Sequence, residues 1–319
     1  MSPVEVPPSR TGILGGGQLG VASAVLAARA GHEVLLWTRS ADKIPGIWAQ
    51  LRSLMAFCDN QLGAPAGGHG SIRIVTDLAR VAQESDTLLE CIVEDMEAKV
   101  ALLRRLTHGR QPGKRVLSAT SGLSITAMAR SSRLENTLVG AHFWNPPYLI
   151  PVVEVTAGED TPPYVVEGAC RWLESLGKIP IRCPDIPGFI GNRLMHALWR
   201  EALSLVDKGV CSPADLDTIV KYTFALRLPA LGPFENMDLA GMDLVNRVQQ
   251  YLLPDLAANA HPAQCLQDRL REGKTGMAAG AGFYQWDAGQ AADKVRQRDL
   301  TILHLLRMLG KIPPAPGQQ

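Results

Sequence analysis

The glycine-rich turn near the start of the chain constrains the fold more than any other stretch. A short apolar segment at 12–14 leads into Gly15-Gly16-Gly17-Gln18-Leu19-Gly20, which an alanine-rich helical pattern and a second apolar segment at 33–37 follow. Strand, G-x-G-x-x-G turn, helix and strand within about 30 residues is the arrangement that holds the pyrophosphate of a dinucleotide. We therefore predict an α/β fold that opens with a Rossmann-type dinucleotide-binding domain.

The glycines of this turn have separate tasks. Gly15 permits the tight turn, Gly17 lets the backbone approach a pyrophosphate, and Gly20 lets the helix pack close to the strand. Gln18 and Leu19 lie where the helix begins, and free amides and the helix dipole attract phosphate there. We expect all five residues to contact the cofactor.

The residues after the second predicted strand bear on the choice of cofactor. A site for NAD usually has Asp or Glu here, which holds the ribose 2′-hydroxyl, whereas this chain has Thr38-Arg39-Ser40. A guanidinium can pair with a 2′-phosphate, and neighbouring hydroxyls can donate hydrogen bonds to it. NADP is thus the expected cofactor. NAD stays possible, in which case Arg39 is a solvated loop residue or stacks on adenine.

Polar residues follow several further predicted strands at their carboxyl ends. Ligands of open α/β sheets bind beyond these ends, and Glu94, Ser121 and His142 are expected to converge there. The predicted strands span 72–75, 86–92, 115–118, 138–142, 152–156 and 179–183, and helices are predicted over 47–62, 77–83, 163–176 and from 94 onward.

One histidine and one carboxylate lie in apolar surroundings in the stretch 140–154. His142 follows an apolar segment, and Glu154 ends another. An imidazole titrates near neutral pH, and a carboxylate on one ring nitrogen fixes the tautomer and stabilises the imidazolium. The pair is a candidate general base with its partner, although a histidine beside a strand is also common as a hydrogen-bonded structural residue.

The second half of the chain is predicted to be mostly helical. Helices are expected over 191–208, 215–223 with Ser212 as the N-cap, 234–253 and 294–309. We place the domain boundary at the Pro187-Gly188 turn, so that 1–186 form the dinucleotide-binding domain and 187–319 a helical domain for substrate binding and dimerisation.

Composition excludes several classes of function. The 32 basic and 31 acidic residues leave a net charge of +1, so no field favours nucleic acid or an anionic membrane, and no apolar run is long enough to span a bilayer. Six scattered cysteines form no C-x-x-C motif and no Cys/His cluster. We therefore expect no metal site, a reducing cytoplasmic location and a small-molecule substrate.

Several motifs occur together in an order that identifies a family. They are Gly15-x-Gly17-x-x-Gly20, Glu90-Cys-Ile-Val-Glu94 with Lys99, Ser118-Ala-Thr-Ser121, His142-Phe-Trp-Asn145-Pro146 with Glu154, Asp185-Ile-Pro-Gly-Phe-Ile-Gly-Asn192-Arg193, Gly232-Pro-Phe-Glu235 with Asp238, and Gly282-Phe-Tyr284. With these motifs the chain resembles the 3-hydroxyacyl-CoA dehydrogenase superfamily over nearly its whole length after the first ten residues.

The resemblance implies a role for each matching position. His142 looks like the general base in oxidation and the acid in reduction, with Glu154 as its orienting partner. Ser121 and Asn192 look like donors to the reacting oxygen, and Asn145 like a support of that pocket. Glu94 and Lys99 are implied to lie near the nicotinamide, and the helical domain to form a homodimer.

Two departures from the family pattern bear on the substrate and cofactor. Thr38-Arg39 replaces the usual acidic residue, and the segment after Asn145 reads Pro146-Pro147-Tyr148-Leu149-Ile150-Pro151, which is similar to the branch that acts on gulonate, carnitine or pyridine carboxylates. Trp144 and Tyr148 are candidates to wall a compact pocket, and the alternative is that both aromatics are core residues. A small hydroxy acid is the expected substrate. A 3-hydroxyacyl-CoA or carrier thioester is the alternative, and a non-catalytic, crystallin-like or cofactor-binding protein is a second one.

Overall fold

The computed structural model describes residues 9–107 and 114–314. One eight-stranded sheet lies in the first part of the chain, in the order β3-β2-β1-β4-β5-β6-β7-β8. The strands β1 to β6 are parallel, whereas β7 runs antiparallel to β6 and β8 pairs with β7 in parallel. Their bounds are β1 (Arg10–Leu14), β2 (Glu33–Trp37), β3 (Ile72–Val75), β4 (Thr87–Glu90), β5 (Arg115–Ser118), β6 (Leu138–Phe143), β7 (Val152–Ala157) and β8 (Ile179–Cys183).

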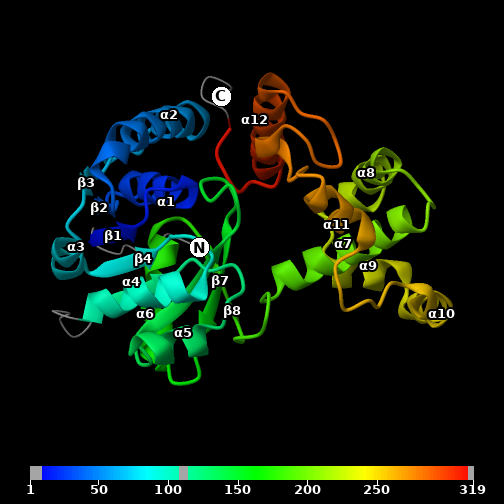
Figure 1. Ribbon diagram of the computed structural model, residues 1–319, viewed down its shortest axis with the longest axis horizontal. Coiled ribbons are helices and arrows are strands. Elements are labelled where there is room, and N and C mark those ends of the chain that lie inside the picture. The colour runs from blue at the N-terminus through cyan, green and yellow to red at the C-terminus, as the bar shows by residue number, and fades with distance from the viewer. Residues whose placement is uncertain (1–8, 108–113, 315–319) are drawn as a thin grey trace. The chain divides into compact units, whose positions relative to one another are not determined.

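Helices cover both faces of this sheet (Figure 1). Successive side chains of a strand point to opposite faces, and in β2 Val34 and Leu36 enter one core while Leu35 and Trp37 enter the other. The helices are α1 (Gln18–Arg29), α2 (Ile44–Leu62), α3 (Leu78–Glu84), α4 (Met96–Thr107), α5 (Ile125–Ser132) and α6 (Pro163–Ser175), with a 3₁₀ turn, η1 (Ala41–Lys43). The predicted Rossmann-type fold is therefore confirmed.

The chain divides into two compact units. The first comprises Met1–Arg193 with Ile312–Gln319, and the second comprises Leu194–Lys311. The segment 187–193, which we had assigned to the helical domain, clusters with the sheet. The helix α7 (Gly191–Asp207) begins in the first unit and ends in the second.

The second unit is helical, as predicted. Its helices are α8 (Pro213–Tyr222), α9 (Pro233–Ala240), α10 (Met242–Leu252), α11 (Gln264–Arg271) and α12 (Ala288–Met308), with 3₁₀ turns η2 (Phe224–Leu226), η3 (Leu253–Asp255) and η4 (Met277–Ala279). Ser212 caps α8 through a capping box, which confirms its predicted role.

Two details of the helix prediction were wrong. The single helix predicted over 234–253 is two helices, because Gly241 interrupts it with a φ of 89°. The helices α5 and α11 were not foreseen. Within 9–107 and 114–314, no helix is both long enough and apolar enough to cross a membrane.

Candidate active site

The glycine turn has the geometry that a dinucleotide requires. Gly15 has a φ of 129°, which favours glycine, and a Cβ on Gly20 would collide with the carbonyl oxygen of Gly15. A Cβ on Gly17 would meet no atom within 4 Å. Packing within the protein thus requires glycine at positions 15 and 20, and a Cβ on Gly16 would collide with the side chain of Ile47, whereas none of the described residues constrains Gly17 in this way. The open space at Gly17, before the first turn of α1, fits an approaching pyrophosphate.

The residues after β2 lie beside this turn. Thr38 is buried, its Cβ lies 3.7 Å from the position of a Cβ on Gly16, and its amide donates to the carbonyl of Val75. Arg39 is exposed and forms no salt bridge with any residue that the structure describes. A guanidinium in this position is available to a ligand at the end of β2.

His142 and Glu154 are direct cross-strand partners. They pair in the register of the antiparallel strands β6 and β7, which places both side chains on the same face. The Nδ1 of His142 lies 2.7 Å from Oε2 of Glu154, and both side chains are buried. Because a carboxylate only accepts hydrogen bonds, Nδ1 donates, and Nε2 keeps the lone pair that a base needs.

Four donors surround the carboxylate of Glu154. Its Oε1 accepts from the amides of Ile190 and Gly191, each at 2.9 Å, and its Oε2 accepts from His142 and from Nε1 of Trp144 at 3.2 Å. Burial by itself would raise the pKa of this carboxyl, but the Gly191 amide, the His142 ring and the Ile190 amide together lower it. Glu154 therefore stays ionised, and it also fixes the start of α7.

The segment before α7 closes one side of the imidazole. The buried ring of Phe189 lies 5.9 Å from the His142 ring, and a Cβ on Gly122 would come within 3.3 Å of Gly188. Asp185 accepts from the hydroxyl of Ser124 and from two amides at the start of α5. Residues 185–191 thus tie the turn after β5 to the β6–β7 pair.

Ser121 and Asn192 are held together at this junction. The Nδ2 of Asn192 donates to the carbonyl of Ser121 at 2.6 Å. The amide of Ser121 donates to Oε1 of Glu94 at 2.6 Å, and the hydroxyl of Thr120 donates to the same oxygen. The structure therefore brings Glu94, Ser121 and Asn192 into one hydrogen-bonded chain. Glu94 and Ser121 are two of the three residues predicted to converge at the ends of the strands.

Lys99 forms one buried ion pair, with Glu90, and a longer one with Glu94 of this chain. Its Nζ lies 2.8 and 2.9 Å from the two carboxylate oxygens of Glu90 and 3.4 Å from Oε2 of Glu94. Glu90 also accepts from the hydroxyl of Ser118 at 2.6 Å. The Lys99 side chain is 1% exposed, and its ion pairs connect it to Glu90 and Glu94. Glu90 belongs to the same sequence motif as Lys99, but its role as the partner of Lys99 was not predicted.

Residues 146–151, which follow Asn145, are held in place by side chains that lie outside the His142–Glu154 site. Lys178 is buried, and its Nζ donates to the carbonyls of Pro147 and Ile150 at 2.5 and 2.8 Å. Tyr148 packs edge-on against Phe57 of α2, with ring centroids 5.8 Å apart, and belongs to the core. Asn145 itself is exposed. Of the two aromatics predicted as pocket walls, Trp144 is the one in contact with the His142–Glu154 pair.

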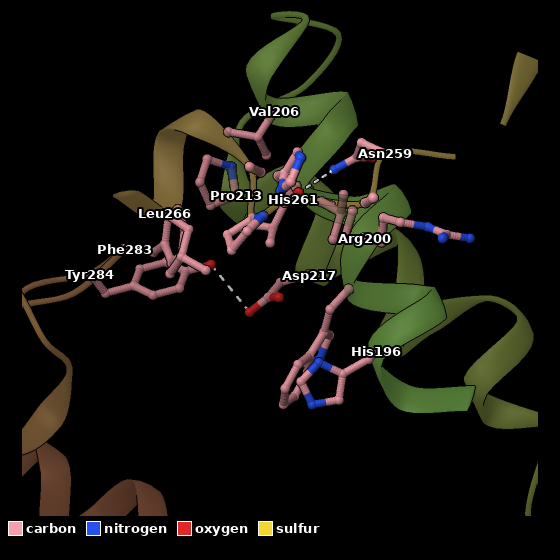
Figure 2. Close-up of a pocket in the computed structure, with 17 residues that line it drawn as sticks. His196, Arg200, Val206, Pro213, Asp217, Asn259, His261, Leu266, Phe283 and Tyr284 are labelled. Carbon is pink, nitrogen blue, oxygen red and sulfur yellow. Dashed lines mark hydrogen bonds between the residues drawn. The ribbon is translucent and has the colours of Figure 1, made fainter. Parts of the chain in front are cut away.

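A separate hollow lies within the helical unit (Figure 2). Its volume is about 710 Å³, and it is lined by α7, α8, α11 and the segments before and after α11. Tyr284 donates to Asp217 across it, at 3.2 Å. No paired base and carboxylate of the His142–Glu154 kind is found among its lining residues.

Two family models together match most of the chain. The model described as "3-hydroxyacyl-CoA dehydrogenase, NAD binding domain" matches residues 10–186, and "3-hydroxyacyl-CoA dehydrogenase, C-terminal domain" matches residues 188–286. The matched regions contain the glycine turn and the His142–Glu154 pair in the first, and Asn192 in the second.

Characterised relatives are similar along almost their whole length. A 5-formyl-3-hydroxy-2-methylpyridine 4-carboxylate 5-dehydrogenase of Mesorhizobium japonicum is 30% identical over 303 residues, which is 93% of this chain and 97% of the relative. An L-carnitine dehydrogenase of Streptomyces coelicolor is 32% identical over 317 residues, covering 95% and 94%. The crystal structure of a 5-formyl-3-hydroxy-2-methylpyridine 4-carboxylic acid 5-dehydrogenase, described as an NAD+-dependent dismutase, superposes with a TM-score of 0.91 at 28% identity and covers 96% of this chain and 100% of that one.

Proposed function

This chain belongs to the 3-hydroxyacyl-CoA dehydrogenase family, whose members use a nicotinamide cofactor on CH–OH groups, and we propose that it oxidises a small polar hydroxy acid or reduces the corresponding carbonyl compound. The observation that carries this proposal is the buried His142–Glu154 pair beside the Ser121–Asn192 junction. These groups lie at the carboxyl edge of a sheet that begins with a dinucleotide turn.

The proposed roles follow from the hydrogen bonds of each group. A bound nicotinamide supplies or accepts a hydride, which leaves one proton for the protein to move. Nε2 of His142 takes the hydroxyl proton in oxidation and returns it in reduction, while Glu154 fixes the tautomer. The hydroxyl of Ser121 and the second amide hydrogen of Asn192 donate to the reacting oxygen. Asn145 supports this pocket, and Glu94, braced by Lys99, borders the nicotinamide.

Similarity to enzymes of small polar compounds supports the substrate class. The pyridine-carboxylate and carnitine dehydrogenases each align with more than nine-tenths of this chain. The family description favours 3-hydroxyacyl-CoA esters instead. A panel of free hydroxy acids and 3-hydroxyacyl-CoA esters, followed by reduced-nicotinamide absorbance, separates the two. Turnover of free acids alone supports the proposal, turnover of CoA esters alone replaces it with the alternative, and turnover of neither compound class refutes both.

We propose further that the cofactor is NADP. The exposed Arg39 and the hydroxyls of Thr38 and Ser40, with no carboxylate among them, support this choice over the NAD that the family description names. A wild-type preference for NADP of about tenfold or more is expected, since each charge-assisted hydrogen bond contributes about 1.5–3 kcal/mol. Arg39→Ala should lose that preference, with the kcat/KM for NAD unchanged. A wild-type protein that prefers NAD would refute the assignment.

We also propose that the helical unit forms a homodimer. No residue of α7, α8, α9, α10 or α11 is buried, and Tyr251 of α10 is 87% exposed. Helices with an apolar face need a partner, and large exposed apolar patches mark interaction sites. The hollow of Figure 2 also has apolar lining residues, Val206 and Leu266 among them. The proposed partner is a second copy of this chain.

We propose a reducing, cytoplasmic location, which the six free thiols support.

Light scattering tests the assembly directly. Wild-type protein should have twice the mass of the 34.4 kDa chain, and Tyr251→Asp should weaken the dimer. Tyr164→Asp is the matched control, because Tyr164 is 73% exposed on α6 of the first unit. A monomeric wild-type protein, or dimers equally weakened by both variants, would contradict the proposed interface.

A further inference from the structure

The carboxylate oxygen that holds the catalytic imidazole is shared with a second donor. Oε2 of Glu154 accepts from Nδ1 of His142 at 2.7 Å and from Nε1 of Trp144 at 3.2 Å. The other oxygen accepts from the two amides at the start of α7. The His142 imidazole and the Trp144 indole therefore both donate to the same oxygen of Glu154.

The position of Trp144 is fixed by close packing. The residue directly follows β6 and is half-buried. A Cβ on Gly191 would collide with the indole ring, so the glycine leaves room for it. The ring centroid lies 5.1 Å from that of His142, with an angle of 52° between the planes. The packing around the indole thus fixes the direction of its N–H toward Glu154.

We propose that Trp144 is a positioning residue that acts on His142 through Glu154. By donating to Oε2, the indole stabilises the carboxylate charge and weakens its attraction for the imidazole proton. The imidazolium is then stabilised less than it would be by an unshared carboxylate. This inference rests on the proposed role of His142 as the acid and base of the reaction.

The neighbouring groups do not provide another explanation for a pH effect in the neutral range. On β7 lies Glu154, whose pKa is lowered, and on β8 lies Cys183, whose thiol pKa burial raises above its usual range. On the segment before α7, burial would raise the pKa of Asp185, but the hydrogen bonds from the start of α5 lower it. Arg193 at the start of α7 donates to the carbonyl of Pro187. Among these neighbours, the charge states remain constant while an imidazole titrates.

Trp144→Phe removes the N–H and keeps an aromatic ring. The acid limb of the pH profile of kcat/KM should move to higher pH by about 0.5–1 unit, a fraction of the effect expected of one hydrogen bond to a charged group. The affinity for the cofactor should not change. Trp172→Phe is the matched control, because the buried Trp172 on α6 also donates through Nε1, to Thr11, at a distance from this site.

A second measurement does not depend on turnover. The ring signals of His142, assigned in NMR spectra with His142→Ala, should titrate with a midpoint that is higher in Trp144→Phe than in the wild type. Glu154→Gln should move the midpoint in the opposite direction, because it removes the charge. An unchanged or lower midpoint in Trp144→Phe overturns the inference. Absence of turnover in the wild type would overturn the proposed function instead, and the NMR titration would still decide the role of Trp144.

Discussion

Replacing Glu154 by glutamine tests the core of the site, because the two side chains have the same shape. Oε1 of the glutamine still accepts from the Ile190 and Gly191 amides, whereas its NH2 group faces His142 and Trp144, which donate to Glu154 in the wild type. To restore its hydrogen bond, the imidazole must accept at Nδ1 and carry its proton on Nε2. In that tautomer it has no lone pair for the substrate hydroxyl.

The expected magnitudes follow from these four contacts. Loss of the base function should lower kcat/KM by about 10²- to 10⁴-fold. Two hydrogen bonds lose their charge assistance, worth about 1 kcal/mol each, and the Trp144 N–H loses its acceptor, so the free energy of unfolding should fall by about 3 kcal/mol. The cofactor affinity should be preserved, since the glycine turn makes none of these contacts.

Steady-state kinetics, denaturant unfolding and a cofactor-binding titration measure the three quantities separately. Glu159→Gln is the control, because Glu159 is an exposed carboxylate paired with Arg130 on the surface, and it should change neither rate nor stability appreciably. A Glu154→Gln enzyme with a kcat/KM within about threefold of the wild type would refute the proposed tautomer control.

Three further perturbations test other parts of the account. Gly17→Ala should leave the melting temperature unchanged and weaken cofactor binding about tenfold or more, whereas Gly20→Ala should also lower the melting temperature, because only its Cβ collides with the protein. Lys99→Met should destabilise the protein by about 3–5 kcal/mol by leaving Glu90 buried without its partner, and adding Glu90→Leu should recover most of this loss in denaturant unfolding. Because the pKa of Asp185 is lowered in the folded state, its stabilisation is present above about pH 4 and is lost as the pH falls further, so Asp185→Asn should show a shallower acid unfolding curve than the wild type.

For each of these three predictions, one outcome would contradict it. Equal cofactor affinity in Gly17→Ala and wild type would remove the turn from the cofactor site. A double variant as unstable as Lys99→Met alone would show that the buried charge is not the cause. Parallel acid unfolding curves for Asp185→Asn and wild type would mean that the carboxylate contributes no proton linkage.

The parts of the fold that follow local rules could be predicted from the sequence. Glycine spacing and apolar segments predicted β1, α1 and β2, and Ser212 predicted the start of α8. The short helix α5 was missed because one of the groups that caps it, Asp185, lies about 60 residues later in the chain. The break at Gly241 was missed because the helical pattern continues on both sides of it.

The residues of the candidate site and the contact between His142 and Glu154 were predicted, whereas most of the other contacts were not. The number of residues between His142 and Glu154 does not determine which residues of the two strands pair. The two side chains meet because β7 runs antiparallel to β6. The ion pair of Glu90 with Lys99 and the hydrogen bond of Trp144 to Glu154 were likewise not predicted, although both residues belong to the quoted motifs. Such roles depend on contacts between segments, which residue pattern alone does not specify.

The central claim is that His142 moves the proton of a dehydrogenase reaction, and one comparison tests it most directly. Wild type and His142→Ala would be assayed with a substrate that the hydroxy-acid and CoA-ester panel identifies, by reduced-nicotinamide absorbance, after a binding titration with the cofactor. The account predicts equal cofactor affinity and a turnover about 10²- to 10⁴-fold lower in His142→Ala. Equal turnover in the two proteins would remove His142 from the reaction and contradict the account.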